Sequence, residues 1–469
     1  MKFIYKGIGL ISILFIVASC SFSKKQIVSK AEANDSCKIE VVVLDPGHFH
    51  ASLLQKETLT DVSDTIRIYA PEGIAVNQYL ESIDSYNQRA ESPTTWKKQV
   101  YTGDDYLQKM LADHKGNIAV LAGNNQKKTR YIMESIKAGH HVLADKPLAI
   151  NPQDFKLLTE AYQLAKEKNL LLYDLMTERY DILNIIEKEL LHQTELFGDL
   201  QKGSPDNPSV IMESVHHFFK TVSGKPLIRP AWYYDVEQQG EGIADVTTHL
   251  IDLINWQCFP DKTIHYQSDV TVNAAKHWAT PITLAEFSQS TQVDSFPAYL
   301  NRYIKKDVLE VMANGSLNYT VKGICIGIKV TWHYTPPTNG GDTFTSIKKG
   351  SKATLKIVQD EKNGFVKELY IQKEPDIDNR TFEAQLQKTV EQLQITYPFL
   401  SVKNKKNGTY LIDIPQEKRL GHEEHFSKVA KAFLHYVHNQ DMPEWENENT
   451  LAKYYITTAA VEMAKKGNK

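Results

Sequence analysis

One continuous stretch, residues 118–150, constrains the fold more than any other part of this chain. It opens with a short apolar run of strand length at 118–122, continues with helical spacing over 129–138, and reaches a second strand at 141–144. Gly139 follows the helical spacing directly and is a typical helix stop. This order of a strand, a helix and a strand predicts two parallel strands joined by a helix.

The second of these strands ends at Asp145-Lys146-Pro147. Because a proline disfavours helical geometry at the residue before it, Lys146 is expected to be extended at the carboxyl end of the strand. Ligands bind at that edge of open α/β sheets. The sequence therefore places Lys146 where it can act on a bound substrate.

The other periodic segments predict two domains, of class α/β followed by α+β. Residues 38–175 are expected to form a Rossmann-type, doubly wound parallel sheet, with strands at 39–44, 65–69 and 170–174, helices at about 51–59 and 154–167, and an extra helix and loop within 76–98. Residues 176–469 are expected to form a large open antiparallel sheet with helices. Its predicted strands lie at 209–219, 263–275, 308–312, 316–334, 343–347, 353–358 and 367–371, with a hairpin turn at Asn314-Gly315 and late helices at about 422–438 and 450–465.

Composition excludes several functional classes. The chain has 469 residues and a net charge of −3, which gives no electrostatic basis for nucleic-acid binding. Cys37, Cys258 and Cys325 are too widely spaced for a disulfide framework or a zinc pattern. The run His422-Glu-Glu-His425 also departs from the zinc-binding spacing and is interpreted as a polar helix start, so no metal site is predicted.

The N-terminus has the features of an export signal. Residues 1–6 are basic, 7–19 are apolar but too short to span a bilayer comfortably, and Val17-Ala-Ser-Cys20 resembles the end of a bacterial lipoprotein signal. The resemblance implies cleavage after residue 19, a lipid on Cys20, and a polar tether over 20–37. We therefore expect a cell-envelope lipoprotein, anchored to a membrane through its lipid and facing the periplasm or the outer membrane.

A second motif lies at residues 240–256, where two glycines precede a helical segment. Asp245, His249, Asp252 and Trp256 share one stripe of this helix. Taken alone, a solvated polar stripe is the simpler interpretation. The combination with Lys146, about a hundred residues earlier, favours a functional site instead.

These two motifs together resemble the Gfo/Idh/MocA oxidoreductase family. Residues 138–149 match its most recognisable segment, with Asp145 where glutamate is usual, and the resemblance covers most of residues 39–300. The run 216–232 looks like a branch of the family found in lipoproteins of Bacteroidetes-type bacteria. The family has a dinucleotide-binding domain followed by an open-faced β-sheet domain.

The resemblance implies an NAD(P)-dependent oxidoreductase that moves a hydride between a nicotinamide and a sugar, a polyol or a sugar derivative, with NAD or NADP held tightly. His249 would take the proton of a substrate hydroxyl, Lys146 would bond the same oxygen, and Asp245 would orient the imidazole or contact the substrate. Further residues are implied in binding roles. For the cofactor these are Gly47, His48, Phe49, Asn124, Asn125, Asp145 and Lys146, and for the substrate Arg179, His217 and Trp232.

The loop after the first strand departs from the family pattern G-x-G-x-x-G/A. It reads Asp45-Pro-Gly47-His-Phe-His50-Ala, which keeps only the middle glycine. Asp45 would repel phosphate unless its side chain points away, and His50 stands where a small residue is usual. Glu72 is a displaced candidate for binding the ribose. Lys128, where a histidine is common, could reach a phosphate or be a solvated side chain, and the second interpretation is slightly favoured.

Two alternatives remain open. One is a glycosidase that oxidises its substrate transiently and keeps its NAD; the other is a non-catalytic, membrane-tethered carbohydrate-binding protein whose dinucleotide site has decayed. The sequence does not name the sugar or choose between NAD and NADP. It also leaves the oligomeric state open, a homo-oligomer included.

Overall fold

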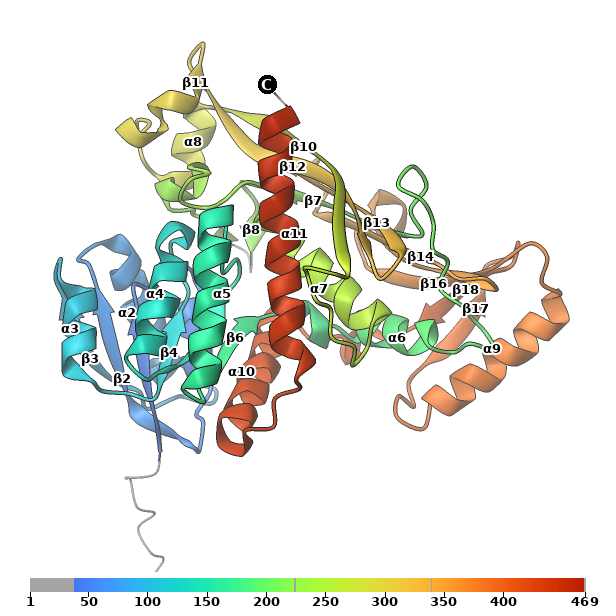
Figure 1. Ribbon diagram of the computed structural model, residues 1–469, viewed down its shortest axis with the longest axis horizontal. Helices are drawn as coiled ribbons and strands as arrows, with labels where there is room; N and C mark the ends of the chain where they lie inside the picture. The colour runs from blue at the N-terminus through green and yellow to red at the C-terminus, as the bar shows by residue number, and fades with distance from the viewer. Residues whose placement is uncertain (1–37, 223–224, 339, 468–469) are drawn as a thin grey trace, which may run out of the picture. The chain divides into compact units, whose positions relative to one another are not determined.

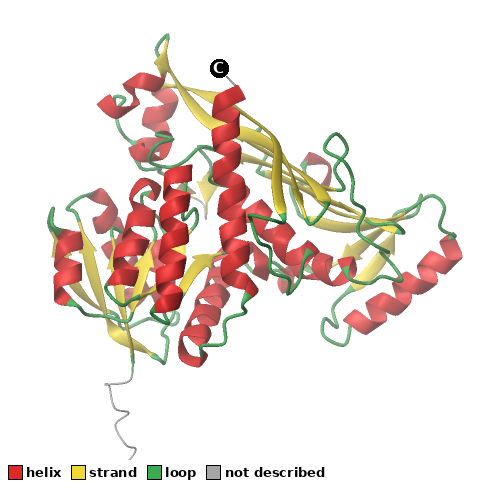
Figure 2. Cartoon of the chain, in the orientation of Figure 1, coloured by secondary structure: helices red, strands yellow, loops and turns green. Residues whose placement is uncertain are grey.

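The computed structural model describes residues 38–222, 225–338 and 340–467 (Figures 1 and 2). The predicted signal peptide, the tether and Cys20 lie outside these residues, and the domain boundaries near 37 and 175 stay predictions. Within the described ranges, no helix combines the length and the apolar character needed to cross a bilayer.

The first domain contains a six-stranded sheet that confirms the predicted Rossmann-type arrangement. All strands are parallel, in the order β3-β2-β1-β4-β5-β6. The central strands β1 and β4 are buried almost throughout, which explains why they are continuous apolar runs. The strands are β1 Ile39–Leu44, β2 Val62–Ala70, β3 Lys97–Thr102, β4 Ile118–Leu121, β5 His141–Asp145 and β6 Leu172–Leu175.

The helices of this domain correct the predictions at two points. The predicted helix at 51–59 is only one turn, α1, followed by a short 3-10 segment at residues 54–56. Strand β3 and helix α3 were not predicted. For β3 the reason is that it is an exposed edge strand whose polar sequence resembles a loop. The helices are α1 His50–Leu53, α2 Ile74–Gln88, α3 Tyr106–Asp113, α4 Asn125–Lys137 and α5 Pro152–Glu167.

The second domain contains a ten-stranded sheet whose main path is β10-β12-β13-β7-β14-β15-β16-β18-β17, with β11 beside β12. Its neighbours are antiparallel except β13 and β7, so the sheet is mixed. The strands are β7 Val210–His217, β10 Val270–Thr283, β11 Ile304–Lys305, β12 Val308–Val321, β13 Ile324–His333, β14 Thr343–Lys349, β15 Ala353–Gln359, β16 Glu368–Lys373, β17 Ser401–Asn404 and β18 Thr409–Asp413. A separate small hairpin pairs β8 Thr221–Val222 with β9 Lys225–Pro226.

The hairpin turn predicted at Asn314-Gly315 is wrong, because β12 runs straight through both residues. The chain turns instead at Lys322 and Gly323, which both have positive φ. The Asn314 side chain is used inside the sheet, where it accepts a hydrogen bond from the Trp332 backbone N–H at 2.7 Å. A side chain at Gly315 would overlap Ile243, so the glycine serves close packing rather than a turn.

The two predicted late helices are present, and they return to the first domain. Phe426 and Phe433 of α10 lie in the core beneath β1 and β2, and α11 packs against α5 as well as β10 and α7 (Figure 1). The first turn of α10 thereby reaches α1, directly after the loop that follows β1, where His422 contacts His50. The helices of this half are α6 Ile182–Leu191, α7 Thr247–Cys258, α8 Leu284–Thr291, α9 Asn379–Leu393, α10 His422–Asn439 and α11 Trp445–Gly467.

Candidate functional site

Lys146 and Asp245, which are 99 residues apart in the sequence, form an ion pair between the two domains. Lys146 follows β5, Asp245 lies in the turn before α7, and Nζ donates to Oδ1 at 2.6 Å. Burial disfavours both charges, but the attraction between them outweighs it. The pKa of Lys146 is therefore raised and that of Asp245 lowered, so both groups stay charged.

His249 lies one helical turn beyond Asp245 on α7. Burial, and next the positive charge of Lys146, lower the pKa of its imidazole to about 3. An unperturbed imidazole has a pKa near working pH, so the fold moves the pKa of His249 far from its ordinary value. The Nδ1 atom is buried and finds no hydrogen-bond partner among the described residues. His249 is therefore a neutral imidazole with an unused polar atom, which leaves it able to form a hydrogen bond with a ligand.

The depressed pKa of His249 predicts how stability depends on pH. Between pH 6.5 and about 3 the unfolded chain takes up a proton at this residue while the folded chain does not, so acid destabilises the fold. We expect the melting temperature of His249→Gln to fall less steeply than that of the wild type as the pH is lowered from 7 to 4.5. The same change at the exposed His435 is the control. Identical slopes for His249→Gln and the wild type would contradict the prediction.

A cleft opens at the carboxyl end of β1, where doubly wound folds bind dinucleotides. Gly47, His48 and Phe49 of the β1–α1 loop line it, with Tyr79 of α2 opposite and Trp232 from the second domain. Three predicted cofactor residues therefore line this cleft. Trp232, predicted to bind substrate, lines the same cleft, beside Gly47.

Asp45, the replacement for the first glycine of the motif, does not face this cleft with its carboxylate. Its backbone adopts the positive φ of 48° that favours glycine. Its side chain accepts a hydrogen bond from the Tyr131 hydroxyl at 2.7 Å and pairs with Lys127 at 3.3 Å. The carboxylate is thus turned away and compensated, so it does not oppose a phosphate.

Two backbone N–H groups of this loop are not free to bind a phosphate. The N–H groups of Gly47 and His48 both donate to the Ala122 carbonyl, at 3.0 and 3.1 Å. Arg229 and His48 line the cleft and can supply side-chain donors instead. With Asp45 turned away and Gly47 leaving room, these residues fit a dinucleotide pyrophosphate.

Asn124 and Asn125 join the domains instead of facing the cleft. Their side-chain amides donate to Gln238 Oε1 and to the Gln239 carbonyl, both at 2.8 Å. Lys128 is buried and donates to Asn125 Oδ1 at 2.6 Å, so its interpretation as a solvated side chain is wrong. Burial lowers the pKa of Lys128 to about 8.

His50 and His422 link the cofactor loop to α10. His50 Nδ1 lies 2.9 Å from Asp145 Oδ1, and its Nε2 lies 2.8 Å from Nε2 of His422. His422 and His425 lie in the first turn of α10, as the interpretation as a polar helix start predicts, and His422 in addition contacts the β1–α1 region through His50. Sequence reasoning missed it because the contact spans 372 residues, and two histidines in a first helical turn were the only signal.

Two predicted substrate residues are held by other side chains. The Arg179 guanidinium binds Asp252 in a bidentate pair, at 2.6 and 2.7 Å, and also both oxygens of Glu446. His217 is buried, with Nδ1 2.9 Å from Asp342. Their substrate contacts stay predictions, while the structure shows them as parts of buried polar networks.

Glu178 is a further residue that the sequence did not single out. It lies between β6 and α6 and shares a hollow with Lys367 and His422. Its attraction to Lys367 lowers the pKa of the Glu178 carboxyl to about 2 despite burial. Glu178 also acts electrostatically on His249. It therefore adds a fixed negative charge to the edge of the site.

The first domain is of Rossmann type and has a cleft at its sheet edge. A Lys–Asp ion pair, close to a neutral histidine, joins it to the open-sheet domain. These features together define a two-domain, nucleotide-dependent oxidoreductase. The comparisons agree. Residues 68–174 match the Gfo/Idh/MocA model, "Oxidoreductase family, NAD-binding Rossmann fold", and residues 186–465 match the "Putative oxidoreductase C terminal domain". The chain belongs to the Gfo/Idh/MocA oxidoreductase family.

Solved structures extend this result. A "putative oxidoreductase" of Parabacteroides merdae is 46% identical, with a TM-score of 0.91 and coverage of 92% of this chain and 98% of its own. A protein of gentamicin A biosynthesis solved with NAD is 15% identical, with a TM-score of 0.54 and coverage of 92% and 95%. A 3-ketoreductase of Actinomadura kijaniata solved with NADP is 13% identical, with a TM-score of 0.53 and coverage of 90% and 96%. The last two show the fold alone. The comparison with curated proteins finds no match.

Proposed function

We propose that this oxidoreductase transfers a hydride between NAD or NADP and a sugar, a polyol or a sugar derivative. The observation that carries the proposal is the Lys146–Asp245 pair, 2.6 Å long, with His249 one turn further along α7. Asp245 lines a small hollow together with Tyr233, and Tyr233 also lines the cleft of Gly47, His48 and Phe49. A sugar fits this arrangement because its hydroxyl groups can form hydrogen bonds with several charged and polar side chains at once.

Each of the three residues has a defined task in this reaction. Lys146 donates a hydrogen bond to the reacting oxygen and stabilises the negative charge that develops there. Asp245 keeps the ammonium charged and in place. His249, neutral at working pH, accepts a hydrogen bond from the substrate hydroxyl and takes its proton as the hydride leaves. The nicotinamide, when bound, supplies the hydride chemistry.

Two of the fold relatives support the substrate class. One is a 3-ketoreductase and the other belongs to gentamicin A biosynthesis. Both were solved with a nicotinamide dinucleotide, which supports the cofactor assignment for the cleft. Their low identity makes them support for the proposal and no more.

Cofactor retention is the first test. We expect purified protein to release NAD or NADP on denaturation, detected by mass spectrometry, or to bind it on titration. Gly47→Val should weaken binding at least tenfold, because the middle glycine leaves room for the pyrophosphate and a branched side chain fills that room. Gly341→Val, at a site where a Cβ meets only Phe365 at 3.7 Å, is the matched control.

The substrate is then found by following NADH or NADPH absorbance with a panel of sugars and polyols. A net absorbance change confirms the oxidoreductase. Sugar release without a net change indicates the glycosidase that oxidises transiently. Sugar binding by protein that neither retains nor binds a dinucleotide would overturn the proposal and indicate the carbohydrate-binding protein.

We also propose that the chain is a cell-envelope lipoprotein anchored through Cys20. The order of the basic, apolar and small residues before Cys20 supports this. Mass spectrometry of the membrane fraction should find a lipid-modified N-terminal peptide that begins at Cys20. An unmodified peptide that still carries residues 1–19 would contradict the proposal.

A further inference from the structure

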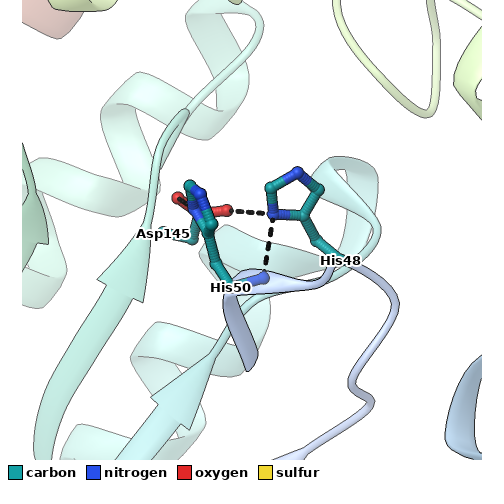
Figure 3. A group of neighbouring side chains, drawn as sticks. All are labelled: His48, His50 and Asp145. Carbon is teal, nitrogen blue, oxygen red and sulfur yellow. Dashed lines mark hydrogen bonds and ion pairs between the residues drawn. The ribbon is translucent and has the colours of Figure 1, made fainter. Parts of the chain in front are cut away.

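Two histidines and an aspartate meet at the edge of the cofactor cleft (Figure 3). The Nδ1 atoms of His48 and His50 and a carboxylate oxygen of Asp145 all lie within 4.8 Å of one another. His48 Nδ1 is 3.1 Å from Oδ2, and His50 Nδ1 is 2.9 Å from Oδ1. Both imidazoles thus direct the same kind of nitrogen at one carboxylate.

These separations are close to those around a metal ion. Nitrogen and oxygen ligands bind zinc at about 2.0–2.2 Å, so two ligands of one ion lie roughly 3.0–3.5 Å apart. The 2.9 and 3.1 Å contacts between imidazole and carboxylate need to grow by only a few tenths of an ångström, and the ligand atoms as a group lie within 4.8 Å of one another. The donors match in type as well, because two imidazoles and one carboxylate form a common ligand set for zinc and for ferrous iron.

The surroundings of His50 are compatible with the tautomer that binds a metal. His50 and Asp145 are 5% and 3% exposed, so neither side chain is free to turn away. When Nδ1 of His50 binds an ion, its proton lies on Nε2, which is 2.8 Å from Nε2 of His422 and can donate to it. Metal-bound histidines almost always donate their second N–H in this way, which fixes the tautomer.

We propose that His48, His50 and Asp145 form a site for one divalent transition-metal ion of the zinc type. Two neutral imidazoles and one carboxylate carry a net charge of −1, which favours a dication. Three protein ligands leave a coordination position open, and His48, the ligand that lines the cleft, places that position on the cleft side. The site shares His48 with the cofactor cleft, but metal binding does not depend on the proposed hydride transfer.

This site could not be predicted from the sequence, because its third ligand lies 95 residues after His50. No local spacing pattern covers such a distance. The same contacts also have a simpler explanation, in which both imidazoles donate Nδ1–H to Asp145 and no ion binds. The two explanations predict opposite results in a metal titration.

The experiment measures zinc affinity with a competing chelator dye, on full-length protein first dialysed against a chelator. Cobalt, added separately, reports on the ligands through its visible absorption. We expect one equivalent of zinc in the wild type and at least tenfold weaker binding in His48→Gln and Asp145→Asn. His48 is the most exposed ligand, with 35% of its side chain exposed, so its variant keeps the test valid if Asp145→Asn fails to fold.

The control is His435→Gln. His435 pairs with Asp441 at 3.0 Å on the exposed side of α10, which reproduces a histidine–carboxylate contact without a third ligand. Its zinc affinity should equal that of the wild type. The proposal would be overturned if the wild type did not bind zinc, or if His48→Gln and Asp145→Asn bound zinc as tightly as the wild type does. Because no substrate or dinucleotide enters the measurement, failure here is distinct from failure of the proposed function.

Discussion

Replacing Lys146 with methionine is expected to lower the rate of hydride transfer by at least about 100-fold, the scale at which loss of one preorganised donor acts. Methionine has a similar length but no hydrogen-bond donor, so the reacting oxygen loses the charge that stabilises it. The Nζ atom of Lys146 lies 2.6 Å from Asp245 Oδ1, so the pair joins the two domains. The measurement is single-turnover kinetics by NADH absorbance with the substrate that the panel identifies.

The same change leaves Asp245 buried without its cation, and this has a separate cost. Removing one partner of a buried ion pair destabilises proteins by about 3–5 kcal/mol. The double variant Lys146→Met/Asp245→Asn removes the second charge, so it should regain most of that stability without regaining activity. Turnover restored in the double variant would show that Lys146 acts only by holding the fold. Full activity in Lys146→Met would exclude it from the reaction.

The first domain could be predicted from sequence where its strands are central. Strands β1, β4 and β5 are buried on both faces and are therefore continuous apolar runs. The edge strand β3 was missed because its residues are mostly exposed and polar. The hairpin turn at Asn314-Gly315 was predicted wrongly for a different reason. The pair has the local chemistry of a turn, but the packing of Gly315 on Ile243 outweighs that local preference.

The site shows the same division between local and long-range information. Lys146 and His249 could be found because each stands in a short motif with its own helix or strand signals. The partners His50 and His422 could not, because only the return of α10 to the first domain brings them together. The pKa of His249 was also beyond the sequence, since it depends on burial and on the nearby ammonium of Lys146.

Replacing Gly242 with alanine is expected to have the largest effect on stability. A Cβ at this position would lie 1.8 Å from the Ala313 carbonyl oxygen and 2.4 Å from its carbon. Both atoms are backbone of β12, so no side-chain rotation relieves the overlap. Gly242 also donates its N–H to the Met312 carbonyl at 3.1 Å, which ties the turn to the same strand.

The added methyl group must therefore displace the turn that carries Asp245 and leads into His249. Such a backbone clash costs about 3 kcal/mol or more, which corresponds to a melting temperature lower by roughly 5 °C or to no folded protein. Gly341→Ala is the matched control, because a Cβ there makes only ordinary contacts with Phe365. The measurement is thermal unfolding, which compares the melting temperatures of Gly242→Ala and Gly341→Ala with that of the wild type. A Gly242→Ala protein that melts with the wild type and keeps full activity would mean that β12 and the turn are not in the close contact on which the geometry of the site depends.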